Sequence, residues 1–182
     1  LFSSVLLNPH VTWKNMMLVF FFQLISGSRM FQLMTDDVYL KAYYSGRSVI
    51  KHDEVLAYLK DLRKIHLEMQ AWTESTMDRL ASKYLSSLKK MGLLSGSVKK
   101  EIIHTYFDDF IFVYFVYFIV EMDSSPDILA NRYIRYALMG RDAFISRLRK
   151  RDFSDYWDIT DYGGRIKVEL KKKVDVFKDV QI

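Results

Sequence analysis

The sequence contains no cysteine, which excludes disulfide bonds, thiolate metal sites and cysteine nucleophiles. Proline and glycine are scarce, with 2 and 7 residues among 182, so helices can run long without interruption. The four histidines are scattered, and no two have the i, i+4 spacing of a helical metal site. Glycine-rich phosphate loops and serine-elbow motifs are also missing. We therefore expect no bound metal and no cofactor.

The carboxylates give little support for catalysis. Two adjacent pairs occur, Asp36-Asp37 and Asp108-Asp109. Neighbouring residues point to different sides of a helix or strand, so neither pair suits general acid–base chemistry. Asp36-Asp37 is more typical of a helix start. The sequence thus favours a protein that works by binding and is not an enzyme.

Half of the residues are hydrophobic and 27% are charged, which is the balance of a globular protein. Two apolar runs stand out, at residues 16–25 and 110–120. Each is about half as long as the roughly 20 residues that a membrane-spanning helix needs, and acids bracket the second. We expect both runs in the core, the second as a helix or a buried strand. With no membrane span and no signal peptide evident, we expect a cytoplasmic protein.

Apolar spacing predicts a mainly α-helical fold. Period-3.6 patterns with capping residues and glycine stops mark most of the chain. The predicted helices cover residues 13–34, a short stretch from a Thr35 cap to about 46, 52–69, 77–91 before Gly92, 127–139 and 141–151. Residues 99–106 could be a strand or the start of a helix.

The end of the chain changes its pattern. Residues 156–160 predict a strand, residues 161–164 a turn with two glycines, and residues 165–170 a second strand with strict alternation. This predicts a C-terminal β-hairpin over 156–170 with Ile166, Val168 and Leu170 facing inward. A breaker at residues 122–126 suggests an N-terminal helical lobe, 1–122, and a C-terminal lobe, 123–182, although the chain could also form one compact domain.

Residues 52–100 have the order of a winged helix-turn-helix: a helix, a connection, a capped second helix, then a Leu-rich exit and a Ser/Gly turn. In such a fold the second helix enters the major groove of double-stranded DNA. Its outward face would present arginine for guanine, lysines for phosphates and short hydroxyls that allow close approach. The candidate DNA-binding residues here are Arg79, Ser82, Lys83, Ser86 and Lys90, with Lys99 and Lys100 near the wing. A solvated helix shows the same Ser/Lys pattern, so this alternative stays open.

A second basic segment lies near the C-terminus. The formal net charge is +5, and residues 47–100 and 141–182 both carry an excess of Lys and Arg. A basic helix end followed by a hairpin is a weaker version of the winged arrangement, although lysine also protects exposed strand edges. The candidate DNA-binding residues here are Arg147, Arg149, Lys150, Arg151, Lys171, Lys172 and Lys173.

Several of these stretches resemble the BrxA family of BREX bacteriophage-defence systems. The similar residues are Trp72-Thr73-Glu74-Ser75-Thr76, Leu80-Ala81, Leu85, Leu88 and Met91-Gly92-Leu93-Leu94, followed by Tyr133 to Gly140, the helix to Leu148, Trp157 and the hairpin to Leu170. The resemblance implies an all-helical core with helix-turn-helix-like parts, DNA binding without known catalysis, and action beside other BREX proteins. The family offers no catalytic residue to carry over.

Three functions follow as hypotheses. The first is a non-catalytic accessory protein of phage defence that binds double-stranded DNA. The second is a structural adaptor that holds other defence proteins through its aromatic surface, with no direct nucleic-acid role. The third is a peripheral membrane protein that uses its apolar runs on a lipid surface. Steep salt dependence of duplex binding would distinguish the first from the second.

Overall fold

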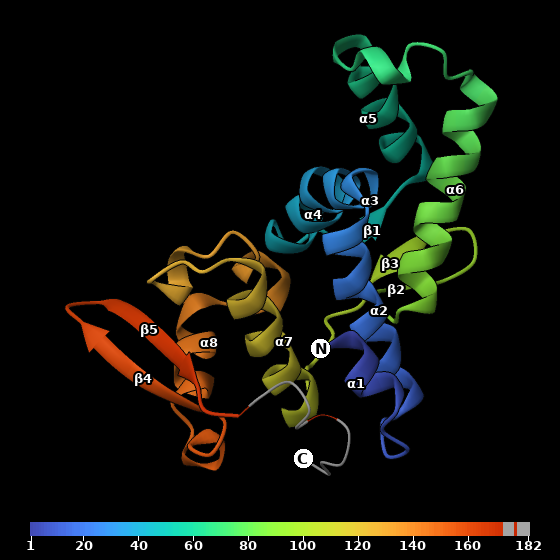
Figure 1. The fold of residues 1–182 in the computed structure, drawn as a ribbon. Helices are drawn as coiled ribbons and strands as arrows, with labels where there is room; N and C mark the ends of the chain where they lie inside the picture. The colour runs from blue at the N-terminus through green and yellow to red at the C-terminus, as the bar shows by residue number, and fades with distance from the viewer. Residues whose placement is uncertain (173–176, 178–182) are drawn as a thin grey trace. The chain divides into compact units, whose positions relative to one another are not determined.

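The computed structural model describes residues 1–172 and residue 177. The chain is mostly helical with a small C-terminal β-hairpin, which confirms this part of the predicted fold class (Figure 1). The helices are α1 (Phe2–Leu6), α2 (Trp13–Gly27), α3 (Arg29–Met34), α4 (Leu40–Tyr44), α5 (His52–Ile65), α6 (Glu74–Lys90), α7 (Asp109–Met122) and α8 (Arg141–Leu148). The strands are β1 (Val49–Ile50), β2 (Leu94–Ser95), β3 (Lys100–Ile102), β4 (Trp157–Tyr162) and β5 (Arg165–Leu170).

The chain forms two compact units, of which one is discontinuous in sequence. The central unit comprises residues 24–105, and the terminal unit combines residues 1–23 with residues 106–182. This division differs from the boundary that we expected at residues 122–126. The physical reason is the aromatic core of the terminal unit, in which the Phe22 ring from α2 lies 5.1 Å from the Phe115 ring of α7.

The predicted helix over residues 13–34 is interrupted at Ser28. The Ser28 side chain caps α3 by accepting a hydrogen bond from the Phe31 N–H at 3.3 Å. The cap that we predicted at Thr35 is wrong, because α3 continues through a π-helical turn, Thr35–Tyr39, into α4. Thr35 is buried and its hydroxyl donates to the Phe31 carbonyl, so it bonds back along the helix.

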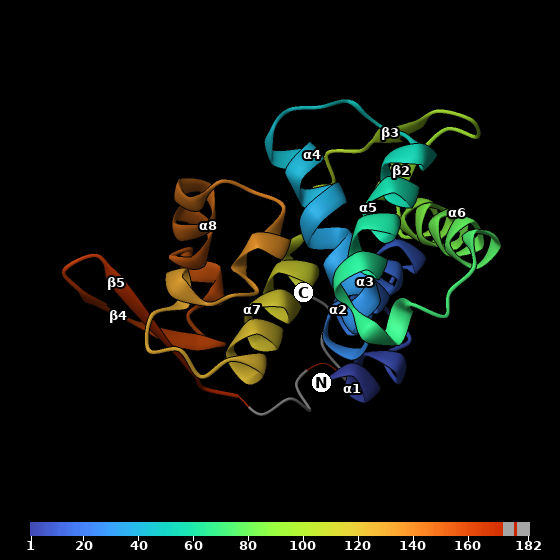
Figure 2. The ribbon, with the colours of Figure 1, turned by 90° about the horizontal axis from the view of Figure 1, so that it is seen from above.

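Helices α5 and α6 are the two successive helices predicted from apolar spacing, and they pack against each other (Figures 1 and 2). Helix α5 ends at Ile65, and a 3-10 turn, Leu67–Met69, covers the rest of the predicted range. Helix α6 begins after Thr73, whose hydroxyl accepts a hydrogen bond from the Thr76 N–H at 3.1 Å. It ends before Gly92, which has the positive φ of 74° typical of a glycine after a helix. The end of α6 before Gly92 was predicted, whereas the helix begins three residues before the predicted start at residue 77.

A small antiparallel sheet completes the central unit. Its strand order is β1-β3-β2, with Val49 opposite Glu101 and Leu94 opposite Ile102. Residues 99–106, for which strand and helix were both open, therefore provide the middle strand. The loop between β2 and β3 extends from the sheet as a short hairpin (Figure 2).

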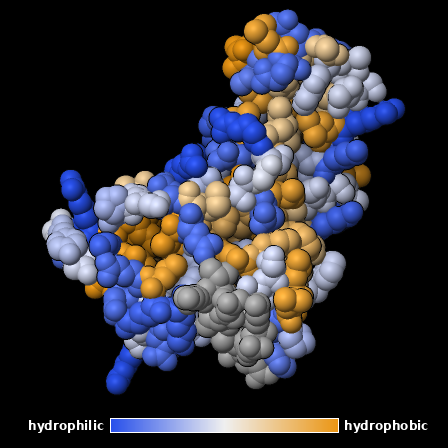
Figure 3. Space-filling model, viewed as in Figure 1, coloured by the Kyte–Doolittle hydropathy of each residue, from blue (hydrophilic) through white to orange (hydrophobic). Residues whose placement is uncertain are grey.

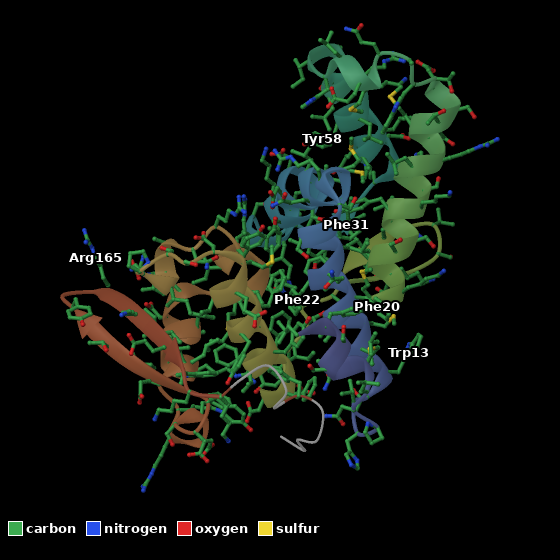
Figure 4. The ribbon with its side chains drawn as sticks, viewed as in Figure 1. Trp13, Phe20, Phe22, Phe31, Tyr58 and Arg165 are labelled. Atoms are coloured by element: carbon green, nitrogen blue, oxygen red, sulfur yellow. The ribbon has the colours of Figure 1, made fainter. Side chains whose placement is uncertain are left out.

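Helix α7 forms the core of the terminal unit and settles the second apolar run as a helix. Asp108 caps it by accepting a hydrogen bond from the Ile111 N–H at 2.9 Å. Every residue from Phe110 to Ile119 is buried, and the labelled Phe22 lies among the rings that pack on this helix (Figure 4). The helix is apolar on all sides because all of its sides are covered.

The predicted helix over residues 127–139 is wrong. This stretch contains two 3-10 turns, Ile128–Ala130 and Ile134–Ala137, with a left-handed residue at Leu138. Buried Asn131 accounts for the irregular path, since its amide donates to the Ile119 carbonyl at 2.7 Å and its oxygen accepts from the Tyr133 N–H. These bonds replace a helical ladder.

Helix α8 ends at Leu148, before the predicted end at residue 151. The Trp157 indole N–H donates to the Leu148 carbonyl at 3.1 Å and satisfies a group that the helix end leaves open. The chain then makes a 3-10 turn, Arg151–Phe153, and enters the hairpin.

The β4–β5 hairpin confirms the predicted turn. Tyr162 pairs with Arg165, so Gly163 and Gly164 form a two-residue connection with φ of 62° and 93°. Ile166 is buried as predicted, whereas Val168 and Leu170 are half-buried. Figures 1 and 2 show the hairpin extending as an arm, and the labelled Arg165 lies near its turn (Figure 4).

Within the described residues, no individual helix has both the length and the apolar character needed to cross a membrane. Helix α2 and the segment Arg29–Tyr44 meet the criterion only when taken together, and a bend of 107° separates them.

Candidate nucleic-acid interface

The candidate residues of α6 lie on one exposed face. The buried side of the helix carries Met77, Ala81, Tyr84, Leu85 and Leu88. The opposite side exposes all five predicted residues of this helix, and Figure 3 shows hydrophilic side chains projecting from it. These exposed residues are Arg79, Ser82, Lys83, Ser86 and Lys90.

The buried side of α6 fixes the direction of this exposed face. The Tyr84 ring lies 5.3 Å from the Phe31 ring of α3 in an edge-on arrangement, and Phe31 is labelled in Figure 4. The Tyr84 hydroxyl also donates a hydrogen bond to the Thr35 hydroxyl at 3.3 Å. A helix held by an aromatic contact and a buried hydrogen bond cannot easily rotate about its axis, so its outward residues keep their orientation.

The cations of this face have no acidic partner among the residues that the structure describes. Arg79, Lys83 and Lys90 form no ion pair with any described residue. Glu74, an acid of the first turn, is instead bound by Lys60 of α5 at 3.1 Å. Lys89 is also exposed beside Lys90. It was not among the predicted contact residues, although basic residues are typical of the last turn of a helix. The face therefore carries positive charge that is available to an anionic partner.

The two lysines near the β2–β3 loop have different roles. Lys99 is exposed. Lys100 is half-buried, and its ammonium donates to the carbonyls of Gly96 and Ser97, so it holds the loop together. Gly96 has a φ of 78°, and a Cβ there would lie 2.0 Å from the Lys99 carbonyl oxygen, so the loop requires glycine. Lys99 thus remains a candidate contact, whereas the Lys100 side chain is committed to the loop.

One polar cluster beside α6 was not found from the sequence. His52, the first residue of α5, places its Nε2 3.1 Å from the Ser82 hydroxyl and 3.6 Å from an Asp78 carboxylate oxygen. Its Nδ1 lies 3.6 Å from the Asp53 carboxylate. Because His52 and Ser82 are 30 positions apart, only the packing of α5 on α6 brings these groups together.

Arg147, a candidate in the C-terminal segment, is buried. Its guanidinium donates to the Phe107 carbonyl and to the Asp109 carboxylate, and it lies 4.5 Å from the centre of the Phe112 ring. The arginine therefore stabilises the start of α7 and does not present its charge to solvent. One cation of the predicted basic helix end, Arg147, is therefore buried inside the terminal unit.

Most of the other C-terminal candidates have acidic or aromatic neighbours. Arg149 pairs with Asp161, and Lys171 pairs with Asp158 at 2.7 Å. Lys150 lies 4.0 Å from Asp109, and Lys172 lies over the Tyr156 ring. Arg151 is exposed, and Lys173 is outside the described residues. These pairings reduce the positive potential that the segment can offer.

The two units also differ in net charge. Residues 24–105 contain 13 Lys and Arg against 9 Asp and Glu, a net charge of +4. The rest of the chain contains 14 against 13, a net charge of +1. Nearly all of the positive excess therefore belongs to the unit that contains α6.

Among the described residues, no group of three or more His, Asp or Glu side chains could hold a metal ion. The fold and the exposed basic helix define a mainly helical protein with a candidate nucleic-acid-binding face. The profile of the BrxA family matches residues 7–115, more than half of the chain, and the chain belongs to this family. Membership points to a protein of a BREX phage-defence system. No curated protein and no solved structure matches the chain.

Proposed function

We propose that this BrxA-family protein is a non-catalytic component of a BREX system that binds double-stranded DNA, with α6 in the major groove. The observation that carries the proposal is the fixed outward face of α6, on which Arg79 and Lys83 have no described acidic partner. Arginine can donate two hydrogen bonds to guanine, and lysine can contact phosphates. The short hydroxyls between them leave room for the backbone to approach the duplex.

The order of elements supports a winged helix-turn-helix in the central unit. A helical segment, Arg29–Tyr44, precedes β1, then come α5, α6 and the two strands β2 and β3. The sheet order β1-β3-β2 is the order in which a winged helix joins its first strand to its wing. In this assignment α6 is the recognition helix, and the β2–β3 loop with Lys99 is the wing.

The test is a gel-shift titration of unrelated duplexes at two salt concentrations. Reversing both charges, Arg79→Glu with Lys83→Glu, should weaken binding tenfold or more, because a good charged contact contributes roughly 1–3 kcal/mol. The salt slope should flatten by about one unit for each lost phosphate contact. Folding should persist, since both residues are exposed.

The matched control is Lys60→Glu with Lys64→Glu on α5. These lysines are already paired, Lys60 with Glu74 and Lys64 with Asp61, so the same change in net charge should weaken binding less. Equal losses in both double variants would show that net charge alone drives binding. Wild-type affinity in the Arg79/Lys83 variant would exclude α6 as the recognition helix.

A structural adaptor is the second candidate function. Ile65, the last residue of α5, and Leu67, in the 3-10 turn that follows, are 75% and 79% exposed, and exposed aliphatic residues close together in the chain favour a protein contact. Retention of BREX proteins on the immobilised protein at high salt, together with no duplex binding at low salt, would favour this function.

A further inference from the structure

Asp78 is an acid on the otherwise basic outward face of α6. It is exposed, and it lies next to Arg79 in the chain. A carboxylate that faces DNA is repelled by phosphates, so it weakens binding that depends on charge alone. It becomes favourable where it accepts a hydrogen bond from a base, because cytosine N4 and adenine N6 carry amino groups in the major groove.

The His52 ring contacts Asp78 from the start of α5. The His52 Nε2 lies 3.3 Å from the Asp78 carbonyl oxygen, 3.6 Å from its carboxylate and 3.1 Å from the Ser82 hydroxyl one turn further along α6. The imidazole thus connects the start of α5 to the part of α6 that would meet base edges. A surface acid without such contacts would sample many rotamers and would lose entropy on binding a base.

We propose that Asp78 is a specificity-determining residue that accepts a hydrogen bond from an exocyclic amino group of cytosine or adenine, and that His52 is its positioning residue. This inference rests on the proposed function, since it places α6 in the major groove. Asp78 then selects cytosine or adenine at one position, beside the guanine contact open to Arg79, whereas Lys83 adds affinity through phosphate.

The experiment is selection of bound duplexes from a randomised library at pH 8, followed by titration of single-base variants of the selected duplex. Wild type should enrich cytosine or adenine at one position and lose about tenfold in affinity when that base is replaced. Comparing the two bases at that position identifies which amino group is bound. Asp78→Ala should abolish the preference at this position alone, while affinity for unrelated duplexes stays equal or rises.

Three further variants separate this role from a general charge effect. Glu74→Ala removes an exposed acid of the same helix and should leave the base preference unchanged. His52→Ala removes the contacts to Asp78 and Ser82 and should weaken the base preference, whereas His52→Gln keeps a hydrogen-bonding side chain and should retain it. All three variants should melt within a few degrees of wild type.

Two results would overturn the inference. An unchanged base preference in Asp78→Ala would show that another residue selects the sequence. Salt-sensitive duplex binding by wild type with no enrichment at any position would refute the inference and leave the proposed function standing. Failure of the proposed function looks different, because either wild type would bind no duplex or the Arg79/Lys83 variant would bind duplex as tightly as wild type.

Discussion

The basic face of α6 and the basic C-terminal segment look alike in sequence, but the structure treats their cations differently. On α6, Arg79 and Lys83 are exposed without a described acidic partner. In the C-terminal segment, Arg147 is buried against Asp109, and Arg149 and Lys171 have aspartate partners. A count of lysines and arginines therefore overstates the positive charge that a surface offers, because paired cations contribute little to the field.

The largest expected effect tests the internal role of Arg147. Arg147→Met should lower the free energy of unfolding by about 2–3 kcal/mol, because it removes the hydrogen bond to the Phe107 carbonyl and leaves Asp109 with only the more distant Lys150. Arg79→Met should change stability by less than about 0.5 kcal/mol, as is usual for an exposed side chain. Urea denaturation of both variants measures the two changes in stability. Equal losses would contradict the conclusion that Arg147 has an internal role and Arg79 does not.

The next effect concerns the β4–β5 arm. Gly163→Val with Gly164→Val should destabilise the hairpin by about 2 kcal/mol, since both positions have positive φ. Duplex binding by the folded fraction should match wild type, because the proposed interface lies in the other unit. Thermal melting and the gel shift together test this pair of expectations, and an unchanged melting temperature would place the turn elsewhere.

A smaller effect distinguishes two buried tyrosines of the central unit. The Tyr39 hydroxyl is buried without a hydrogen-bond partner among the described residues, and burial raises the pKa of this phenol. Tyr39→Phe should therefore be neutral or stabilise the fold by up to about 1 kcal/mol. Tyr84→Phe removes a bond to Thr35 and should destabilise by about 1 kcal/mol. Chemical denaturation should show a loss of stability for Tyr84→Phe and none for Tyr39→Phe. A similar loss in both variants would contradict the hydrogen-bond assignment.

The smallest expected effect is on DNA binding by the C-terminal segment. Arg149→Glu with Lys171→Glu should weaken duplex binding by less than about threefold, because both cations already pair with aspartates. The change equals the charge reversal on α6, so a gel shift at the same salt compares them directly. A loss of tenfold or more here, with no loss on α6, would reverse the comparison and make this segment the leading candidate.

The sequence predicted most of the elements that depend on local signals. Gly92 gave the end of α6, and Gly163-Gly164 gave the hairpin turn, because positive φ is a property of one or two adjacent residues. Local signals failed where a buried polar side chain formed hydrogen bonds with backbone groups in place of the helical ones. Asn131 replaced a predicted helix with two 3-10 turns for this reason.

The candidate interface also has one part that the sequence predicted and another part that it did not. The outward residues of α6 followed from helical periodicity alone, since the inward residues have to be buried. The sequence by itself thus determined a mainly helical chain with an amphipathic, basic α6 and a C-terminal hairpin. The tertiary structure decided which cations remain exposed, as with Arg147, and which polar groups meet, as with His52 and Asp78. These outcomes depend on contacts between residues far apart in the chain, whose energies no local pattern of residue types contains.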